Sequence, residues 1–169
     1  MMRIFVTALL VSALMAVERQ SFLLPDRMHD VRAHLKKIVS EAERTLIIAT
    51  PSLHEKALSD AIAKAAERGT SVTLVTSAEP GDAGGLVRYA NVRLLTLEGL
   101  RAGDFDGRLE VTLLLADGRT GCLGTLPLIH EALAHSVGIL ECSDDPAAAR
   151  RYGAYLDTMI ARSSPYLRP

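Results

Sequence analysis

The chain of 169 residues contains no tryptophan, and its aromatic side chains are limited to three Phe and four Tyr. So few aromatic residues, together with only five Met, give no sign of a cofactor-binding cluster, and we expect no cofactor. The sequence also lacks an excess of either charge, since 19 Lys and Arg stand against 20 Asp and Glu. A balanced charge supplies no long-range attraction for nucleic acid or for an anionic membrane surface, so neither is predicted as a partner.

Several catalytic signatures are also absent. There is no G-x-G-x-x-G or P-loop, no G-x-S-x-G or S-x-x-K motif of serine hydrolases, and no EF-hand spacing. The two cysteines, Cys122 and Cys142, have no metal-ligand spacing around them, so no metal site is predicted. The pair is either a disulfide of an oxidising compartment or two buried thiols, and the sequence favours neither.

No apolar run is long enough to span a membrane as a helix, because the longest, residues 4–17, falls short of the roughly 20 residues required. This run follows the positive start Met1-Met2-Arg3 and ends near small residues, the pattern of a secretory signal peptide. We expect residues 1–16 to be a signal peptide cleaved after Ala13 or Ala16, and the mature protein to be periplasmic or secreted. An uncleaved membrane anchor and a buried first strand are the alternatives.

The chain does contain alternating strands and helices. Residues 45–50 and 71–77 are apolar runs rich in β-branched residues, and residues 53–68 between them have helical spacing that stops at Gly69. This order predicts a βαβ unit with parallel strands and a right-handed crossover.

An amphipathic helix over residues 30–44 precedes this unit. Asp26 or Asp30 is the expected cap, and His34 is placed on the solvated side of the helix. Residues 21–27, which include a proline, are predicted to be a linker.

The second half continues the pattern, and the whole predicts an α/β fold with a mixed sheet of about six strands flanked by helices on both faces. The remaining predicted segments are a strand at 91–96, an irregular stretch at 97–107, a hairpin at 108–127, a short helix or loop at 128–135, a strand at 136–142 and a helix opened by Pro146 that ends near 162.

The hairpin is the most informative of these segments. Asp117-Gly118 stands between two apolar arms, a strong hairpin signal because tight primed turns need positive φ. Residues 109–116 are nearly all apolar, which predicts a central strand covered on both faces. Glu110 and Thr112 interrupt this arm, and because they are two residues apart we expect them on one face of the strand.

The order of these elements, and above all the stretch A-L-S-D-A-I-A-K-A-A-E-R-G-T-S-V-T-L-V, resembles the phospholipase D superfamily over residues 21–163. The closest likeness is to its small secreted bacterial endonucleases, which carry one motif per chain. That motif is H-x-K, four residues, then D, followed by G-S/T-x-N. The resemblance implies a His nucleophile, a second His as acid and base, and Lys and Asn that hold the phosphoryl oxygens. It also implies a homodimer, in which the two His come from two subunits.

Anchoring this motif on Asp117 places Glu110 at the His position and Thr112 at the Lys position. The segment Gly124-Thr125-Leu126-Pro127 aligns with G-S/T-x-N, so Gly and Thr match while Pro replaces Asn. The nucleophile, the cation and the amide donor of the family are therefore all missing from this degenerate motif.

These substitutions predict a phospholipase D-like protein that has lost phosphodiesterase activity and serves a binding or assembly role. The alternative is an active phosphodiesterase, of nuclease or phospholipase D type, with a rearranged site. Glu110, His130 and His135 are the candidates for such a site, the two histidines because they follow the hairpin closely.

Overall fold

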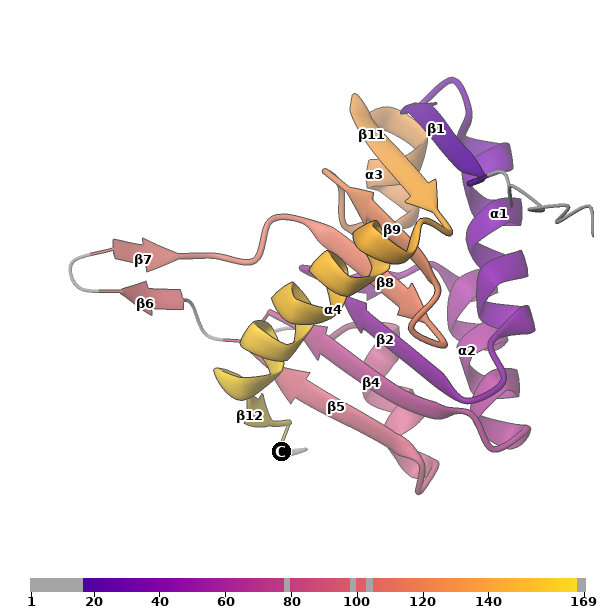
Figure 1. The fold of residues 1–169 in the computed structure, drawn as a ribbon. Helices are drawn as coiled ribbons and strands as arrows, with labels where there is room; N and C mark the ends of the chain where they lie inside the picture. Colours follow the sequence, from indigo (N-terminus) through magenta and orange to yellow (C-terminus); the bar gives the residue numbers. More distant parts are fainter. Residues whose placement is uncertain (1–16, 78–79, 98–99, 103–104, 167–169) are drawn as a thin grey trace, which may run out of the picture.

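A mixed sheet of eight strands forms the centre of the molecule (Figure 1). The computed structural model describes residues 17–77, 80–97, 100–102 and 105–166, so the predicted signal peptide lies outside the described residues. The sheet has more strands than the predicted six, in the order β1-β11-β9-β8-β2-β4-β5-β12. Its strands are β1 (Arg19–Leu24), β2 (Thr45–Ala49), β4 (Ser71–Thr76), β5 (Val92–Thr96), β8 (Thr112–Ala116), β9 (Thr120–Gly124), β11 (Gly138–Ser143) and β12 (Ser164–Pro165).

The predicted βαβ unit is confirmed. Strands β2 and β4 pair in parallel, and helix α2 (Lys56–Glu67) connects them. The chain leaves α2 through Gly69, whose φ of 96° lies in the left-handed region that glycine adopts without strain. A 3₁₀ helix, η1 (Asp82–Arg88), then leads to β5, which extends the parallel part of the sheet.

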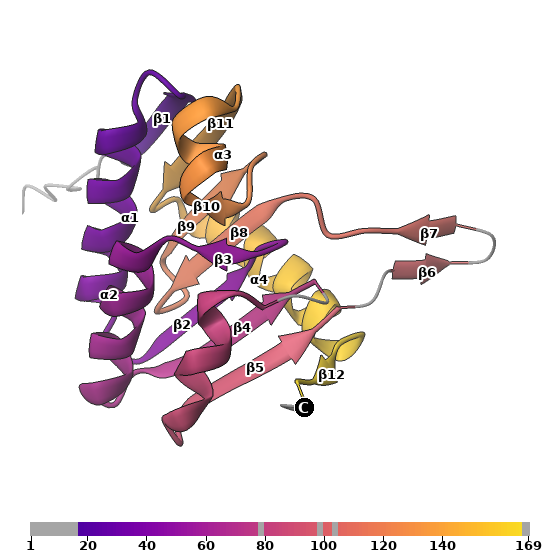
Figure 2. The same ribbon diagram turned by 180° about the vertical axis from the view of Figure 1, so that it is seen from behind.

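Helices cover both faces of the sheet, as predicted. Helices α1 (Met28–Glu41) and α2 lie on one face, and α4 (Pro146–Ala161) crosses the other (Figures 1 and 2). Each face therefore has its own apolar core, and α4 is fixed at its start by Asp145, whose carboxylate accepts a hydrogen bond from the Ala147 N–H.

Helix α1 departs from the prediction in two ways. Its N-cap residue is Arg27, which makes no capping hydrogen bond, so the expected cap by Asp26 or Asp30 is wrong. His34 is not simply solvated: its ring packs against Phe22 with 5.2 Å between ring centroids, and burial lowers the pKa of its imidazole.

The hairpin of β8 and β9 turns at Asp117-Gly118 as predicted, with φ of 54° and 66° at these two residues. Two positive φ values define the type I′ turn that suits the twist of the flanking strands. Strand β8 is central, since it pairs with β9 and β2 and all its residues are buried. It begins at Thr112, however, so Glu110 precedes the strand and does not share a strand face with Thr112.

The predicted linker at residues 21–27 is wrong, because the chain up to Leu24 forms the edge strand β1. β1 pairs antiparallel with β11 along its whole length. Phe22 and Leu24 point into the core while Leu23 between them is exposed, the alternation of a half-buried strand.

Three smaller features complete the fold. The expected irregular stretch contains a two-stranded ribbon, β6 (Leu100–Ala102) and β7 (Phe105–Gly107), which projects from the body in both views (Figures 1 and 2). After β9, the short strand β10 (Leu128–Ile129) pairs in parallel with β3 (Leu53–His54), and α3 (His130–His135) follows it. Within the described residues, we find no helix with the length and apolar character needed to span a membrane.

Cys122 on β9 and Cys142 on β11 form a disulfide. The two residues face each other directly in the antiparallel register, so the bond joins neighbouring strands of the sheet. The sequence left this pairing open, and the strand register decides it.

Candidate functional site

Thr112, which the alignment of the sequence with the motif places at the position of the family Lys, is a buried residue. Only 1% of it is exposed. Its hydroxyl donates a hydrogen bond to the Leu126 carbonyl oxygen at 2.7 Å and lies 2.9 Å from the Thr50 hydroxyl. The Thr50 hydroxyl in turn accepts from the Leu128 N–H at 3.2 Å. These bonds join the end of β2, the start of β8 and the segment after β9, so this position is part of the core and not the floor of an open cleft.

Glu110, which the same alignment places at the position of the family His, has a different environment. Its side chain is exposed and stands before the first residue of β8. The two residues that the alignment places at the attacking and phosphate-binding positions of the family motif are therefore a surface residue and a core residue.

Asp117, which has the same residue type as the Asp of the family motif, stabilises the fold through its carboxylate. Its carboxylate accepts hydrogen bonds from the backbone N–H groups of Glu43, Arg44 and Thr45 at 3.0, 2.8 and 2.9 Å. Burial acts to raise the pKa of this carboxyl, but the three donors outweigh it and hold the pKa below its usual value. Asp117 thus ties the β8–β9 turn to the loop between α1 and β2.

The matching residues Gly124 and Thr125 join β9 to β11. A Cβ at Gly124 would lie 2.9 Å from the Leu140 side chain and 3.2 Å from the Ile139 carbonyl oxygen, so only glycine fits without displacement. The Thr125 N–H donates to the Ile139 carbonyl oxygen at 3.0 Å, and the Thr125 hydroxyl accepts from the Ile139 N–H at 3.1 Å. Each retained motif residue is accounted for by a contact within the fold.

A charged cluster lies beside this network, where β3 and β10 pair. Glu55 and His130 each follow directly after a residue of that pair, and Arg32 reaches them from α1. An Arg32 terminal nitrogen lies 2.9 Å from Oε2 of Glu55, as an ion pair without a well-directed hydrogen bond, and 2.7 Å from Nδ1 of His130. Since arginine only donates, Nδ1 must accept, and the ring proton of a neutral His130 is on Nε2 of this exposed side chain.

His135 does not join this cluster. It is the exposed last residue of α3, five positions after His130, and helix positions share a face when they are three or four apart. The two histidines therefore do not form the acid and base pair that the alternative function would need.

Comparison with solved structures identifies proteins of similar fold. NucT from Helicobacter pylori matches with a TM-score of 0.81 and 22% identity, over 89% of this chain and 99% of NucT. Nuc from Salmonella typhimurium, a phospholipase D family member, matches with a TM-score of 0.72 and 13% identity, over 90% and 99% of the two chains. Phosphatidylserine synthase from Haemophilus influenzae matches at 0.65 and 15% identity, over 89% of this chain and 40% of the synthase. No protein-family model and no curated protein matches the chain.

The chain has the phospholipase D-like fold.

Two residues of this phospholipase D-like domain were missed from sequence alone, Arg32 and Glu55. Arg32 was indistinguishable from other charged residues of an amphipathic helix, and Glu55 from those at the start of a helix. Their meeting with His130 depends on the parallel pairing of β3 with β10, and strands of two residues leave no periodicity to detect.

Proposed function

We propose that this chain is a phospholipase D-like domain without phosphodiesterase activity, which serves as a binding or assembly protein. The observation that carries the proposal is the closed hydrogen-bond network of Thr112, because it occupies the place of the phosphate-binding cation. The fold thus remains while the residues that performed the family chemistry have taken structural roles or moved to the surface.

The chemical argument is one of accumulated losses. Removing a single preorganised donor from an active site typically reduces the rate by about 10²–10³. This chain lacks the His nucleophile, the Lys and the Asn donor together, and it presents a carboxylate at Glu110 where an anionic phosphodiester would approach. A carboxylate without a neighbouring cation repels that substrate, so Glu110 is a poor replacement for the nucleophile.

We further propose that the domain is exported and acts in the periplasm or outside the cell. Residues 1–16 have the composition of a signal peptide, and the bond between Cys122 and Cys142 suits an oxidising compartment. A homodimer is proposed as well, on the likeness to the single-motif members of the superfamily.

The alternative function, an active phosphodiesterase with a rearranged site, has one specific observation in its favour. Arg32 supplies a cation and the exposed ring of His130 carries an Nε2–H donor, so together they offer two hydrogen-bond donors to a phosphate group. No nucleophile accompanies them among the described residues of this cluster, apart from the buried Glu55 carboxylate that Arg32 already neutralises.

The two functions are separated by assaying the purified mature protein on bis(p-nitrophenyl) phosphate and on single-stranded DNA. Our proposal predicts no turnover above buffer. Any residual activity should be unchanged in Arg32→Ala, His130→Ala and Glu110→Ala, and also in His29→Ala, an exposed histidine at the start of α1 that serves as the control. Turnover that disappears in one of the first three variants and persists in His29→Ala would establish the active alternative.

A further inference from the structure

Three potential metal ligands from three different elements converge on the α1 side of the sheet. The Sγ atoms of Cys122 and Cys142 and a ring nitrogen of His34 all lie within 4.8 Å of one another. Strands β9 and β11 supply the sulfurs and α1 supplies the imidazole. Two sulfurs and one imidazole are the donor set that Zn²⁺ prefers.

The imidazole of His34 is held in place without satisfying its own hydrogen-bonding capacity. Its Nε2 is buried and has no hydrogen-bond partner among the described residues, while the ring rests against Phe22. Buried polar atoms are nearly always paired, so an unpaired Nε2 on a ring that lies close to two sulfurs calls for an explanation. In the dithiol form of the chain, a metal ion held by the two thiolates would give the imidazole a partner that it lacks in the disulfide form.

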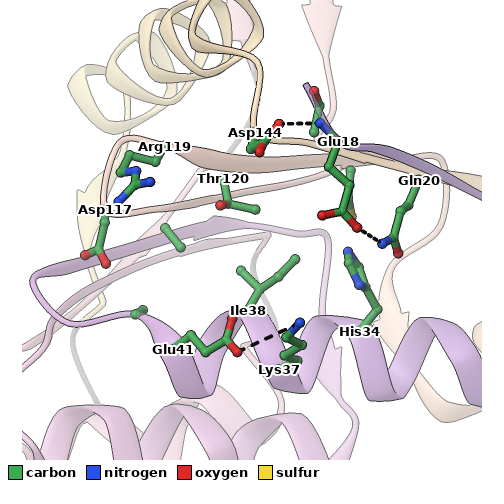
Figure 3. A pocket seen from close by; sticks show the side chains of 14 residues that line it. Glu18, Gln20, His34, Lys37, Ile38, Glu41, Asp117, Arg119, Thr120 and Asp144 are labelled. Atoms are coloured by element: carbon green, nitrogen blue, oxygen red, sulfur yellow. Dashed lines mark hydrogen bonds and ion pairs between the residues drawn. The ribbon is translucent and has the colours of Figure 1, made fainter. Parts of the chain in front are cut away.

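A cavity of about 290 Å³ opens beside this group and gives an ion a route to it. Figure 3 shows Glu18, which precedes β1, and Gln20 of β1 above the His34 ring, with Lys37 and Glu41 of α1 along the lower wall. Four carboxylates line the cavity against one lysine and one arginine, so its charge favours entry of a cation. The space next to His34 also leaves room for a fourth ligand, such as water.

We propose that the dithiol form of this chain binds Zn²⁺ through Cys122, Cys142 and His34, and that the disulfide form does not. A dithiol reductant transfers two electrons to the disulfide, becomes oxidised to its own disulfide and leaves two thiols. Binding then releases the two thiol protons as both sulfurs become thiolates on the ion. This metal-binding proposal holds whether or not the chain has phosphodiesterase activity.

The movement required is small. Tetrahedral Zn²⁺ with sulfur and nitrogen ligands holds its donor atoms roughly 3.5–3.8 Å apart. The three atoms already lie within 4.8 Å, and opening the disulfide frees both sulfurs to rotate about their Cα–Cβ bonds. A shift of about 1 Å in side chains alone is within the reach of such rotations.

The test is a cobalt titration of mature protein that has been reduced and then desalted under inert gas. Co²⁺ reports the site directly, because thiolate ligation gives a charge-transfer band and tetrahedral geometry gives intense visible bands. We expect both at one equivalent of Co²⁺, their displacement by Zn²⁺, and their absence in the oxidised protein. Replacing the imidazole in His34→Ala should weaken binding at least tenfold, whereas His29→Ala on the same helix should bind as the wild type does.

Circular dichroism of the same samples shows whether the reduced protein is folded, so that a loss of binding can be distinguished from a loss of structure. Reduced protein that stays folded should gain thermal stability with Zn²⁺, and reduced protein that loses structure should regain it when Zn²⁺ is added. The proposal is overturned if the reduced chain takes up no Co²⁺, if Zn²⁺ neither stabilises nor restores the fold, or if His34→Ala binds as tightly as His29→Ala.

Discussion

At the scale of single residues, the surviving members of the motif are those that the backbone needs. Asp117 receives three backbone N–H donors, Gly124 has no space for a side chain against β11, and Thr125 bonds the Ile139 backbone. Thr112, which the alignment places at the position of the cation, has buried hydrogen-bond partners instead. Part of a motif can thus remain in a sequence because the fold needs those residues, without any need for the reaction.

Replacing Asp117 tests this structural role. Asp117→Ala removes the acceptor of three N–H groups and places a residue with a Cβ but no polar side chain at φ of 54°. We expect a loss of about 1–3 kcal/mol in the free energy of unfolding, measured by urea denaturation. Asp117→Asn keeps one acceptor oxygen and tolerates the left-handed conformation, so it should lose less; equal losses in the two variants would contradict the account.

The low pKa of Asp117 has a consequence for pH. A carboxyl whose pKa is lower in the folded than in the unfolded chain stabilises the fold above the unfolded value, near 3.9 for Asp, and this contribution fades as the pH falls through the folded pKa. Urea denaturation from pH 7 down to pH 3 should therefore show a steeper loss of stability for the wild type than for Asp117→Asn. Parallel curves would mean that Asp117 does not contribute.

At the scale of elements, the sequence predicts well those segments whose structure is determined by residues within the segment itself. The Asp117-Gly118 turn and the helix that follows Asp145-Pro146 are set by their own residues, and both were confirmed. Strand β1 was missed because its alternation covers few positions beside a proline, and its pairing partner β11 is more than a hundred residues away. The sequence did not predict the cluster of His34 with the two cysteines for the same reason, because these residues are far apart along the chain and have no characteristic spacing.

Strand β1 gives a direct prediction at this scale. Phe22 is 6% exposed and packs in the core, whereas its neighbour Leu23 is 54% exposed on the opposite face. Phe22→Ala should cost about 3–5 kcal/mol of unfolding free energy, and Leu23→Ala should change it by less than about 0.5 kcal/mol. Thermal and urea denaturation of the pair would show similar small effects if residues 21–27 were the linker that the sequence predicts.

At the scale of the whole molecule, two apolar layers around one sheet preserve the phospholipase D-like architecture at 22% identity or less to the solved structures compared. Core packing tolerates exchange of one apolar residue for another, so such a fold is retained while its sequence diverges. Catalysis has no such tolerance, because it depends on a few donors in fixed positions. This difference is the physical basis of our proposal that the architecture persists without the reactive groups.

The proposed homodimer belongs to this scale. Multi-angle light scattering of the mature protein should give twice the chain mass across a dilution series in the micromolar range. A mass equal to that of one chain at every concentration would remove the dimer from the account and leave the proposed loss of activity in place.

The central claim, that the motif strand now serves the core, is tested most directly at Thr112. We would measure the free energy of unfolding of Thr112→Val and Thr112→Lys by urea denaturation, with Glu110→His as the exposed control. The account predicts a loss of about 1–2 kcal/mol for Val, which removes the buried hydroxyl, more than about 3 kcal/mol for Lys, which buries an unpaired charge, and less than about 0.5 kcal/mol for Glu110→His. Lysine accepted at position 112 within about 1 kcal/mol of the wild type would mean that this position opens onto a site, and would contradict the account.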